Sequence, residues 1–212
     1  METERLIRVL AADNDWRGQP VAAWLVVGLI IAAAVSSTIF VTLLHLRPGF
    51  TSALRNPFFD FKFAVTLALA VPAFGLLPML ARPAAPVGRR LWLLGLPVGL
   101  LALGIIADLA VPQRVGWTAR LVGTNARTCL TAIPVMSLPL LAAGLIALRH
   151  GATTRPMLAG SVAGLMSAGF AATLYAAHCT DDSPLFVACW YTLATALVAG
   201  LGAWLGSRLL RF

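Results

Sequence analysis

Residues 21–46 read VAAWLVVGLIIAAAVSSTIFVTLLHL, a run without a single Asp, Glu, Lys or Arg. An α-helix needs about 20 mostly apolar residues to cross the hydrocarbon core of a bilayer. This run is long enough for that, and its apolar residues are continuous rather than alternating, which excludes a strand of a transmembrane barrel. The stretch therefore predicts a membrane-spanning helix.

Five more stretches repeat this pattern along the chain. They cover residues 61–81, 91–111, 128–148, 157–178 and 185–205. Short connections separate them, so we expect neighbouring helices to pack antiparallel. The sequence predicts an all-α polytopic membrane protein: a six-helix transmembrane bundle over residues 21–212, preceded by a tail of residues 1–20 with a short cytoplasmic helix.

The composition supports a lipid environment. Of the 212 residues, 59% are hydrophobic and 11% are charged, whereas a soluble domain has about 25% charged residues. The net charge is +8, but the arginines lie in small groups between apolar runs rather than on one wetted face. We therefore expect contact with membrane lipids and no direct binding of nucleic acid. The first residues mix acidic and basic side chains without an apolar core, so no signal peptide is expected.

The distribution of cations predicts the orientation. With the N-terminus in the cytoplasm, ten cations fall on the inner side and six on the outer side. The inner ones are Arg5, Arg8, Arg17, Arg82, Arg89, Arg90, Arg149, Arg155, Arg208 and Arg211, and the outer ones are Arg47, Arg55, Lys62, Arg114, Arg120 and Arg127. The positive-inside rule then favours a bacterial inner-membrane protein with both termini in the cytoplasm.

Prolines and glycines inside the spans predict bent, closely packed helices. Prolines at 72, 78, 97, 134 and 139 each remove a backbone donor. The pairs Gly95/Gly99, Gly160/Gly164 and Gly202/Gly206 have the spacing that lets two helices approach closely.

The N-terminal tail has an amphipathic pattern. Leu6, Ile7 and Leu10 fall on one face of a short helix, while Arg5 and Arg8 are polar. A helix of this length is not stable alone in water, so its apolar stripe needs a groove on a partner or the membrane surface. The residues by themselves leave both possibilities open.

Cysteines mark a second candidate site. Cys129 begins the fourth span and Cys179 ends the fifth, directly after His178, so antiparallel packing brings them to the same outer face. Thiols with an imidazole suit a soft or borderline metal ion, and an oxidising periplasm also permits a disulfide. Arg127 and a helix N-terminus favour the thiolate of Cys129, so we expect Cys129 to be the more reactive thiol. Cys189 lies about one turn deeper and is expected to be a packing residue.

Other classes of membrane protein fit less well. A thiol–disulfide oxidoreductase needs a paired redox motif, and the sequence has no CxxC. A transporter or channel needs charges near the membrane midplane, whereas Asp108 lies near the outer end of its span, where its side chain is expected either to snorkel to the interface or to pair with an arginine. Lys62 is expected to pair with Asp60 at the membrane surface. No enzymatic activity and no resident cofactor are expected.

Several segments resemble one known family. They include TERLIRVLAAD at 3–13, RPGF and NPFFDFK after the first span, and LYAAHC ending at Cys179. PLFVACWYTL and the terminal LGSRLLRF agree as well. Together they resemble the NrsF family of membrane anti-sigma factors, over nearly the whole chain.

The resemblance implies a function for both ends of the molecule. The tail would hold an extracytoplasmic-function (ECF) sigma factor inactive at the membrane. The paired cysteines of the family match Cys129 and Cys179, and they are implicated in the response to heavy metals or oxidants. A transient metal ion at these thiols is thus one expected signal, and disulfide formation is the other. Cys189 is not part of the family pattern.

Overall fold

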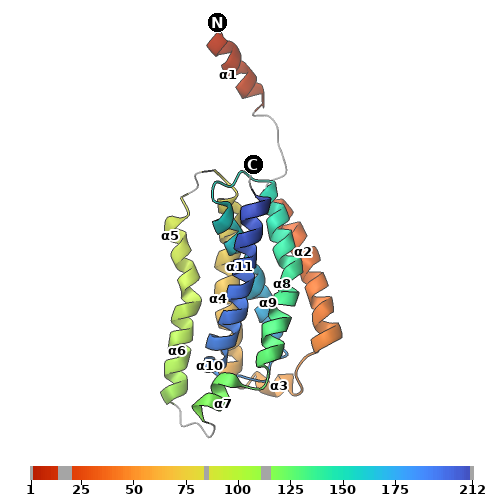
Figure 1. The fold of residues 1–212 in the computed structure, drawn as a ribbon, viewed down its shortest axis with the longest axis vertical. Coiled ribbons are helices and arrows are strands. Elements are labelled where there is room, and N and C mark those ends of the chain that lie inside the picture. Colours follow the sequence, from red (N-terminus) through yellow and green to blue (C-terminus); the bar gives the residue numbers. More distant parts are fainter. Residues whose placement is uncertain (1, 14–20, 84–85, 111–115, 211–212) are drawn as a thin grey trace.

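Six membrane-length helices form an antiparallel bundle in the computed structural model of the chain (Figure 1). The structure describes residues 2–13, 21–83, 86–110 and 116–210. Some predictions fall outside these ranges: the end of the third span at residue 111, the end of the chain at 211–212, and the positions of Arg17 and Arg114. Within them, every regular element is a helix, so the predicted all-α membrane fold is confirmed.

The six predicted spans are present, with small shifts at their ends. The first is α2 (Val21–Ile39) continued by the π-helical turn η1 (Phe40–Leu44), and the second is α4 (Pro57–Leu80). The third combines α5 (Gly88–Leu91), the 3-10 turn η2 (Trp92–Gly95) and α6 (Leu96–Ala110). The fourth is α8 (Ala126–Arg149), preceded by α7 (Trp117–Val122), and the fifth is α9 (Pro156–Ala176). The sixth combines α10 (Pro184–Phe186), the π-helical turn η3 (Val187–Tyr191) and α11 (Thr192–Leu209). A short helix, α3 (Phe50–Ala53), lies between the first two spans.

Local sequence explains where the helices start. Asn56 caps α4 by accepting a hydrogen bond from the backbone N–H of Phe58 at 3.1 Å, and Pro57 supplies a first-turn residue whose missing N–H costs nothing there. Pro156 and Pro184 begin α9 and α10 in the same way. The internal prolines of α4 and α8 lie within continuous helices. Pro97, by contrast, follows the 3-10 turn that interrupts the third span.

Helix α9 is the centre of the bundle and packs against α4, α8 and α11. The approach to α11 depends on glycine. A Cβ added at Gly164 would lie 2.6 Å from the carbonyl oxygen of Val198, and one at Gly206 would lie 2.5 Å from that of Pro156. Two of the three predicted glycine pairs therefore form one close helix contact. The third prediction is wrong, because a Cβ at Gly95 or Gly99 would meet nothing within 4 Å.

The two ends of the bundle differ. Helix α1 (Glu2–Asp13) stands apart, beyond the end of the bundle where α2 begins and α11 finishes (Figure 1). We call this the proximal end. The opposite, distal end carries α3, α7, α10 and the connection of residues 177–182, which we call the distal turn.

Candidate functional site

Cys129 and Cys179 come together at the distal end. Cys129 lies in the first turn of α8, and Cys179 follows the end of α9 at Ala176. Both are free thiols with no exposed surface, and both belong to one buried apolar cluster that also holds Tyr175 and Tyr191. We call Cys129 and Cys179 the thiol pair. Cys189, in η3, is exposed.

His178 is bound to the end of the first span rather than to the thiol pair. Its Nδ1–H donates to the carbonyl oxygen of His45 at 3.0 Å, and its ring packs 5.9 Å from that of Tyr175. Within the described residues, no group of three or more His, Cys, Asp or Glu side chains is close enough to hold a metal ion. A preformed three-ligand site of the thiol pair with His178 is therefore not assembled in this conformation.

Lys62 is the buried cation of this site. It has no exposed surface, and its Nζ donates to the carbonyl oxygen of Cys179 at 2.8 Å and to Oδ1 of Asp182 at 2.7 Å. The predicted pairing with Asp60 is wrong. Asp60 is exposed, because residues two apart on a helix point to nearly opposite sides.

Arg47 binds the distal turn from the end of the first span. Its backbone N–H donates to the carbonyl oxygen of Ala177 at 3.2 Å, and its guanidinium donates to Asp182 at 2.9 and 3.1 Å. The guanidinium and the Lys62 ammonium both lie over the ring of Phe59, at 5.2 and 5.0 Å from its centroid. The Asp182 carboxylate and the face of the Phe59 ring thus both compensate the charges of Arg47 and Lys62, which have lost most of their contact with water.

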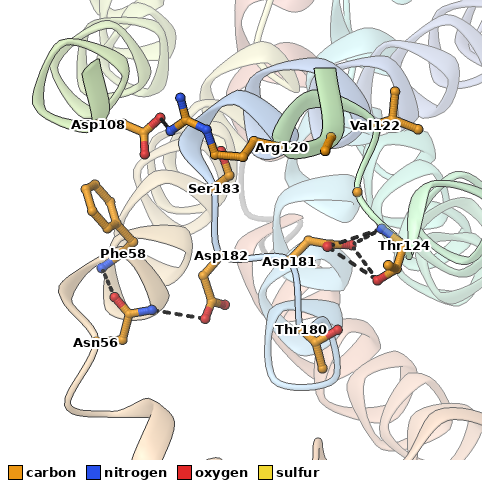
Figure 2. A pocket seen from close by; sticks show the side chains of 12 residues that line it. Asn56, Phe58, Asp108, Arg120, Val122, Thr124, Thr180, Asp181, Asp182 and Ser183 are labelled. Carbon is orange, nitrogen blue, oxygen red and sulfur yellow. Dashed lines mark hydrogen bonds and ion pairs between the residues drawn. The ribbon is translucent and has the colours of Figure 1, made fainter. Parts of the chain in front are cut away.

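Asp181 caps the helix that carries Cys129. Its carboxylate accepts from the backbone N–H groups of Thr124, at 3.0 Å, and Asn125, at 2.8 Å, as Figure 2 shows for Thr124. Asn125 is the N-cap residue of α8, so its N–H is one of the donors that a helix start leaves unsatisfied. The acid also offsets the positive end of the α8 dipole, and Arg127 is exposed while Cys129 is buried. The helix N-terminus and Arg127, on which the expected reactivity of Cys129 rests, therefore favour its thiolate less than the sequence indicates. That Cys129 reacts faster than Cys179 stays a prediction.

Burial and a nearby positive charge have opposite effects on the pKa of the Cys179 thiol. Burial raises the pKa of the Cys179 thiol, and the nearby Lys62 ammonium opposes that increase. The Sγ–H of Cys179 lies 3.7 Å from the carbonyl oxygen of Asp181. In this conformation Cys179 is thus a sheltered thiol, and the distal turn must open before it can react.

A cavity of about 600 Å³, with charged and polar side chains among its lining residues, opens beside the distal turn (Figure 2). Asp108 and Arg120 form an ion pair on one wall, so of the two alternatives expected for Asp108 the structure shows pairing with an arginine. Asp181 and Asp182 lie across from them and turn toward Thr124 and Asn56, respectively. The three carboxylates that line the cavity, those of Asp108, Asp181 and Asp182, are therefore bound to residues of neighbouring segments.

The tail presents its apolar side chains without cover from the bundle. Leu6 is 58% exposed and Ile7 is 59% exposed, and Arg5 and Arg8 are also exposed. The side chain of Leu10 lies outside the described residues. The helix predicted in the tail is therefore present, with the predicted stripe open at least at Leu6 and Ile7.

Sequence reasoning missed the residues that fasten the distal turn. Lys62, Arg47, Asp181 and Asp182 were visible as the only lysine, one outer arginine and an acidic pair in a short connection. Their partners lie far away in the chain: Lys62 and Asp182 are 120 positions apart. No local pattern predicts such a pairing.

Fold and site together define a class: polytopic α-helical membrane proteins with a separate amphipathic N-terminal helix and a buried thiol pair at the far end of the bundle. Residues 10–212 match the family model described as negative regulator of sigma F. The chain belongs to this family, the NrsF family.

Two curated relatives cover the whole chain. The anti-sigma-F factor NrsF of Caulobacter vibrioides (strain NA1000 / CB15N) is 37% identical over 217 residues, and the match spans 100% of both chains. The probable anti-sigma-F factor NrsF of Azospira oryzae (strain ATCC BAA-33 / DSM 13638 / PS) is 32% identical over 216 residues, again across 100% of both. No solved structure matches the chain. The resemblance seen in the sequence is confirmed.

Proposed function

We propose that this chain is a membrane-bound anti-sigma factor: its tail, residues 1–20, sequesters an ECF sigma factor and releases it when a metal ion or an oxidant acts on Cys129 and Cys179. The observation that carries the proposal is the exposed apolar stripe of α1. Leu6 and Ile7 are more than half exposed on a helix that stands apart from the bundle (Figure 1). The full-length relatives named as anti-sigma-F factors support a sigma factor as the occupant.

Binding by the tail follows the physics of amphipathic ligands. A helix of twelve residues is marginal alone in water and gains stability when its apolar face enters a groove. Leu6, Ile7 and Leu10 supply that face, and Arg5 and Arg8 supply charge at its edge for acidic groups on the sigma factor. Contacts of this kind keep the sigma factor at the membrane and away from RNA polymerase.

Orientation follows from the cation count. Ten inner against six outer cations favour both termini in the cytoplasm of a bacterium and the distal end in the periplasm. Helix α1 lies beyond the same end of the bundle at which α11 finishes (Figure 1), which is consistent with termini on one side. The thiol pair then faces a compartment in which disulfides persist.

Two chemistries fit the thiol pair. In metal ligation, each thiol loses a proton and its sulfur donates an electron pair to a soft or borderline ion. His178 is suited to join them through Nε2, which has no hydrogen bond among the described residues, since its Nδ1–H already binds a carbonyl oxygen. In oxidation, the two thiols form one S–S bond, and two electrons and two protons pass to the oxidant. Both require the buried pair to become accessible first.

The two signals differ in the free energy that they have to draw on. Switching the sigma factor from mostly bound to mostly free requires about 5.5 kcal/mol of differential stabilisation. Closed zinc sites supply about 10–16 kcal/mol, whereas a disulfide supplies about 2–4 kcal/mol. Only the difference in affinity between the two states moves the equilibrium, so both signals stay open, and metal ligation has the larger free energy to draw on.

The test is capture of a candidate ECF sigma factor by the full-length protein in mild detergent. Wild type is expected to retain the sigma factor, and Leu6→Asp/Leu10→Asp to lose it at least a hundredfold, because two charges enter an apolar interface. The matched control is Glu4→Gln, which changes charge off the apolar stripe and is expected to retain binding. Equal retention by wild type and the double-Asp variant rejects the proposal.

Sensing is tested separately. Cys129→Ser and Cys179→Ser are each expected to hold the sigma factor normally and to keep holding it when Zn²⁺ or diamide is added. Normal release from either variant would reject sensing by the thiol pair while leaving sequestration intact.

A further inference from the structure

His45 has a backbone conformation that side chains with a Cβ rarely adopt. Its φ is 63° and its ψ is 164°, and it is the only non-glycine residue with positive φ in the described part of the chain. This region of conformational space belongs almost entirely to glycine. Such strain persists only where surrounding contacts impose it, and it concentrates at functional and switching segments.

The distal turn supplies the contacts that hold His45. The carbonyl oxygen of His45 accepts from Nδ1–H of His178 at 3.0 Å. Two residues further on, the Arg47 backbone N–H donates to Ala177 at 3.2 Å, and its guanidinium binds Asp182. The strained residue is thus fastened to the residues on either side of Cys179.

The helix that ends at His45 also contains an element with an alternative geometry. Phe40–Leu44 form the π-helical turn η1, in which the N–H of His45 donates to the carbonyl oxygen of Phe40 at 2.9 Å. A π-turn accommodates one residue more than the α-helix it interrupts, and closing it to α geometry turns the adjoining helix. Such turns recur at functional sites.

Space for this movement lies beside α2. An apolar cavity of about 310 Å³ is lined by Leu29, Ala33 and Ser37 of α2 on one side and by Phe74 and Phe170 across from them. Helix α8, whose Leu140 also lines this cavity, packs against α2, and there the Ser36 hydroxyl donates to the carbonyl oxygen of Met136 at 2.8 Å. A turned α2 must give up that hydrogen bond, so the two arrangements are discrete rather than continuous.

We propose that residues 45–47 are a strained latch, that His178 and Arg47 keep it closed, and that a change at Cys179 opens it, letting α2 turn and alter how the tail is presented. The inference rests on the proposed function for its consequence, because the tail precedes α2 and carries the sigma-binding stripe. The latch itself rests on the geometry of His45, η1 and the distal turn. His45 and His178 are its positioning residues.

The experiment is hydrogen–deuterium exchange of the full-length protein in mild detergent, read at the amides of Phe40–Leu44. His45→Ala keeps the Cβ and its strain, whereas His45→Gly removes both, and the side chain is exposed, so either change leaves the packing intact. Exchange in His45→Gly is expected to be about tenfold slower than in His45→Ala, because the closed latch loses its strain. His178→Phe keeps an aromatic ring but lacks the Nδ1–H donor, and exchange is expected to be about tenfold faster than in wild type.

The two expected effects have opposite signs, and the amides of α4 serve as the internal reference for global unfolding. Equal exchange in His45→Gly and His45→Ala overturns the latch, as does wild-type exchange in a folded His178→Phe. If His178→Phe does not fold, the His45 pair alone decides. None of these readings involves a sigma factor, so loss of sigma capture with the expected exchange rejects only the proposed function.

Discussion

Replacing Gly164 by alanine separates the helices at the centre of the bundle. The new Cβ would lie 2.6 Å from the carbonyl oxygen of Val198 and 2.7 Å from Cα of Ala199, where ordinary contact begins at 3.4 Å. Backbone atoms of α11 cannot rotate away as a side chain does, so α11 must retreat by most of an ångström. Overpacking of this kind costs about 1–3 kcal/mol, and helix propensity returns up to about 1 kcal/mol.

Gly200→Ala is the matched control on the facing helix. A Cβ there would meet nothing within 4 Å, so this variant has the same gain in helix propensity without the collision. We expect Gly164→Ala to unfold about 1–3 kcal/mol more easily than Gly200→Ala, measured by titrating the purified protein from mild detergent into sodium dodecyl sulfate and following helical circular dichroism. Equal midpoints for the two variants would refute the claim that glycine sets the distance between α9 and α11.

Three further outcomes follow from the distal end. Lys62→Met should destabilise the protein by about 3 kcal/mol in the same titration, because it leaves a carboxylate with part of its compensation lost, whereas Asp60→Asn should stay within about 0.5 kcal/mol of wild type. Asp181→Ala should cost about 1–2 kcal/mol through the lost cap and speed hydrogen exchange at the start of α8; unchanged exchange there would contradict the capping role. If the proposed sensing by the thiol pair is right, cells with Cys189→Ser should still raise sigma-dependent reporter transcription when Zn²⁺ or diamide is added. Loss of that response would add Cys189 to the proposed sensor.

The membrane spans were predictable because the hydrocarbon core requires a continuous run of about 20 mostly apolar residues. Their ends were less predictable, because they depend on partners. The first apolar run continues to residue 46, but the helix stops at Leu44, where His45 is held by the distal turn. Likewise Gly95/Gly99 and Gly160/Gly164 have the same spacing, and only the second pair faces another helix. Spacing shows that close approach is possible, not which face a helix turns inward.

At the candidate site, the meeting of Cys129 and Cys179 followed from counting antiparallel spans. The burial of both thiols did not, because it depends on how the distal turn folds over them. That turn is fixed by Asp181 and Asp182, whose partners come from three different helix ends. A short acidic connection looks like a solvated loop in the sequence, and its structural role appears only with the distant cations in place.

The separation of Lys62 from Asp182 also bears on how the molecule is made. Synthesis proceeds from the N-terminus, and these two residues are 120 positions apart. Lys62 is therefore synthesised with the second span before its counter-charge exists, and we expect its ammonium to stay at the water boundary until the fifth span has been inserted. Only then does the lysine acquire its carboxylate and become sealed. Closing of the distal end is thus a late event in biogenesis, and a chain truncated before residue 182 would lack the carboxylate that neutralises Lys62.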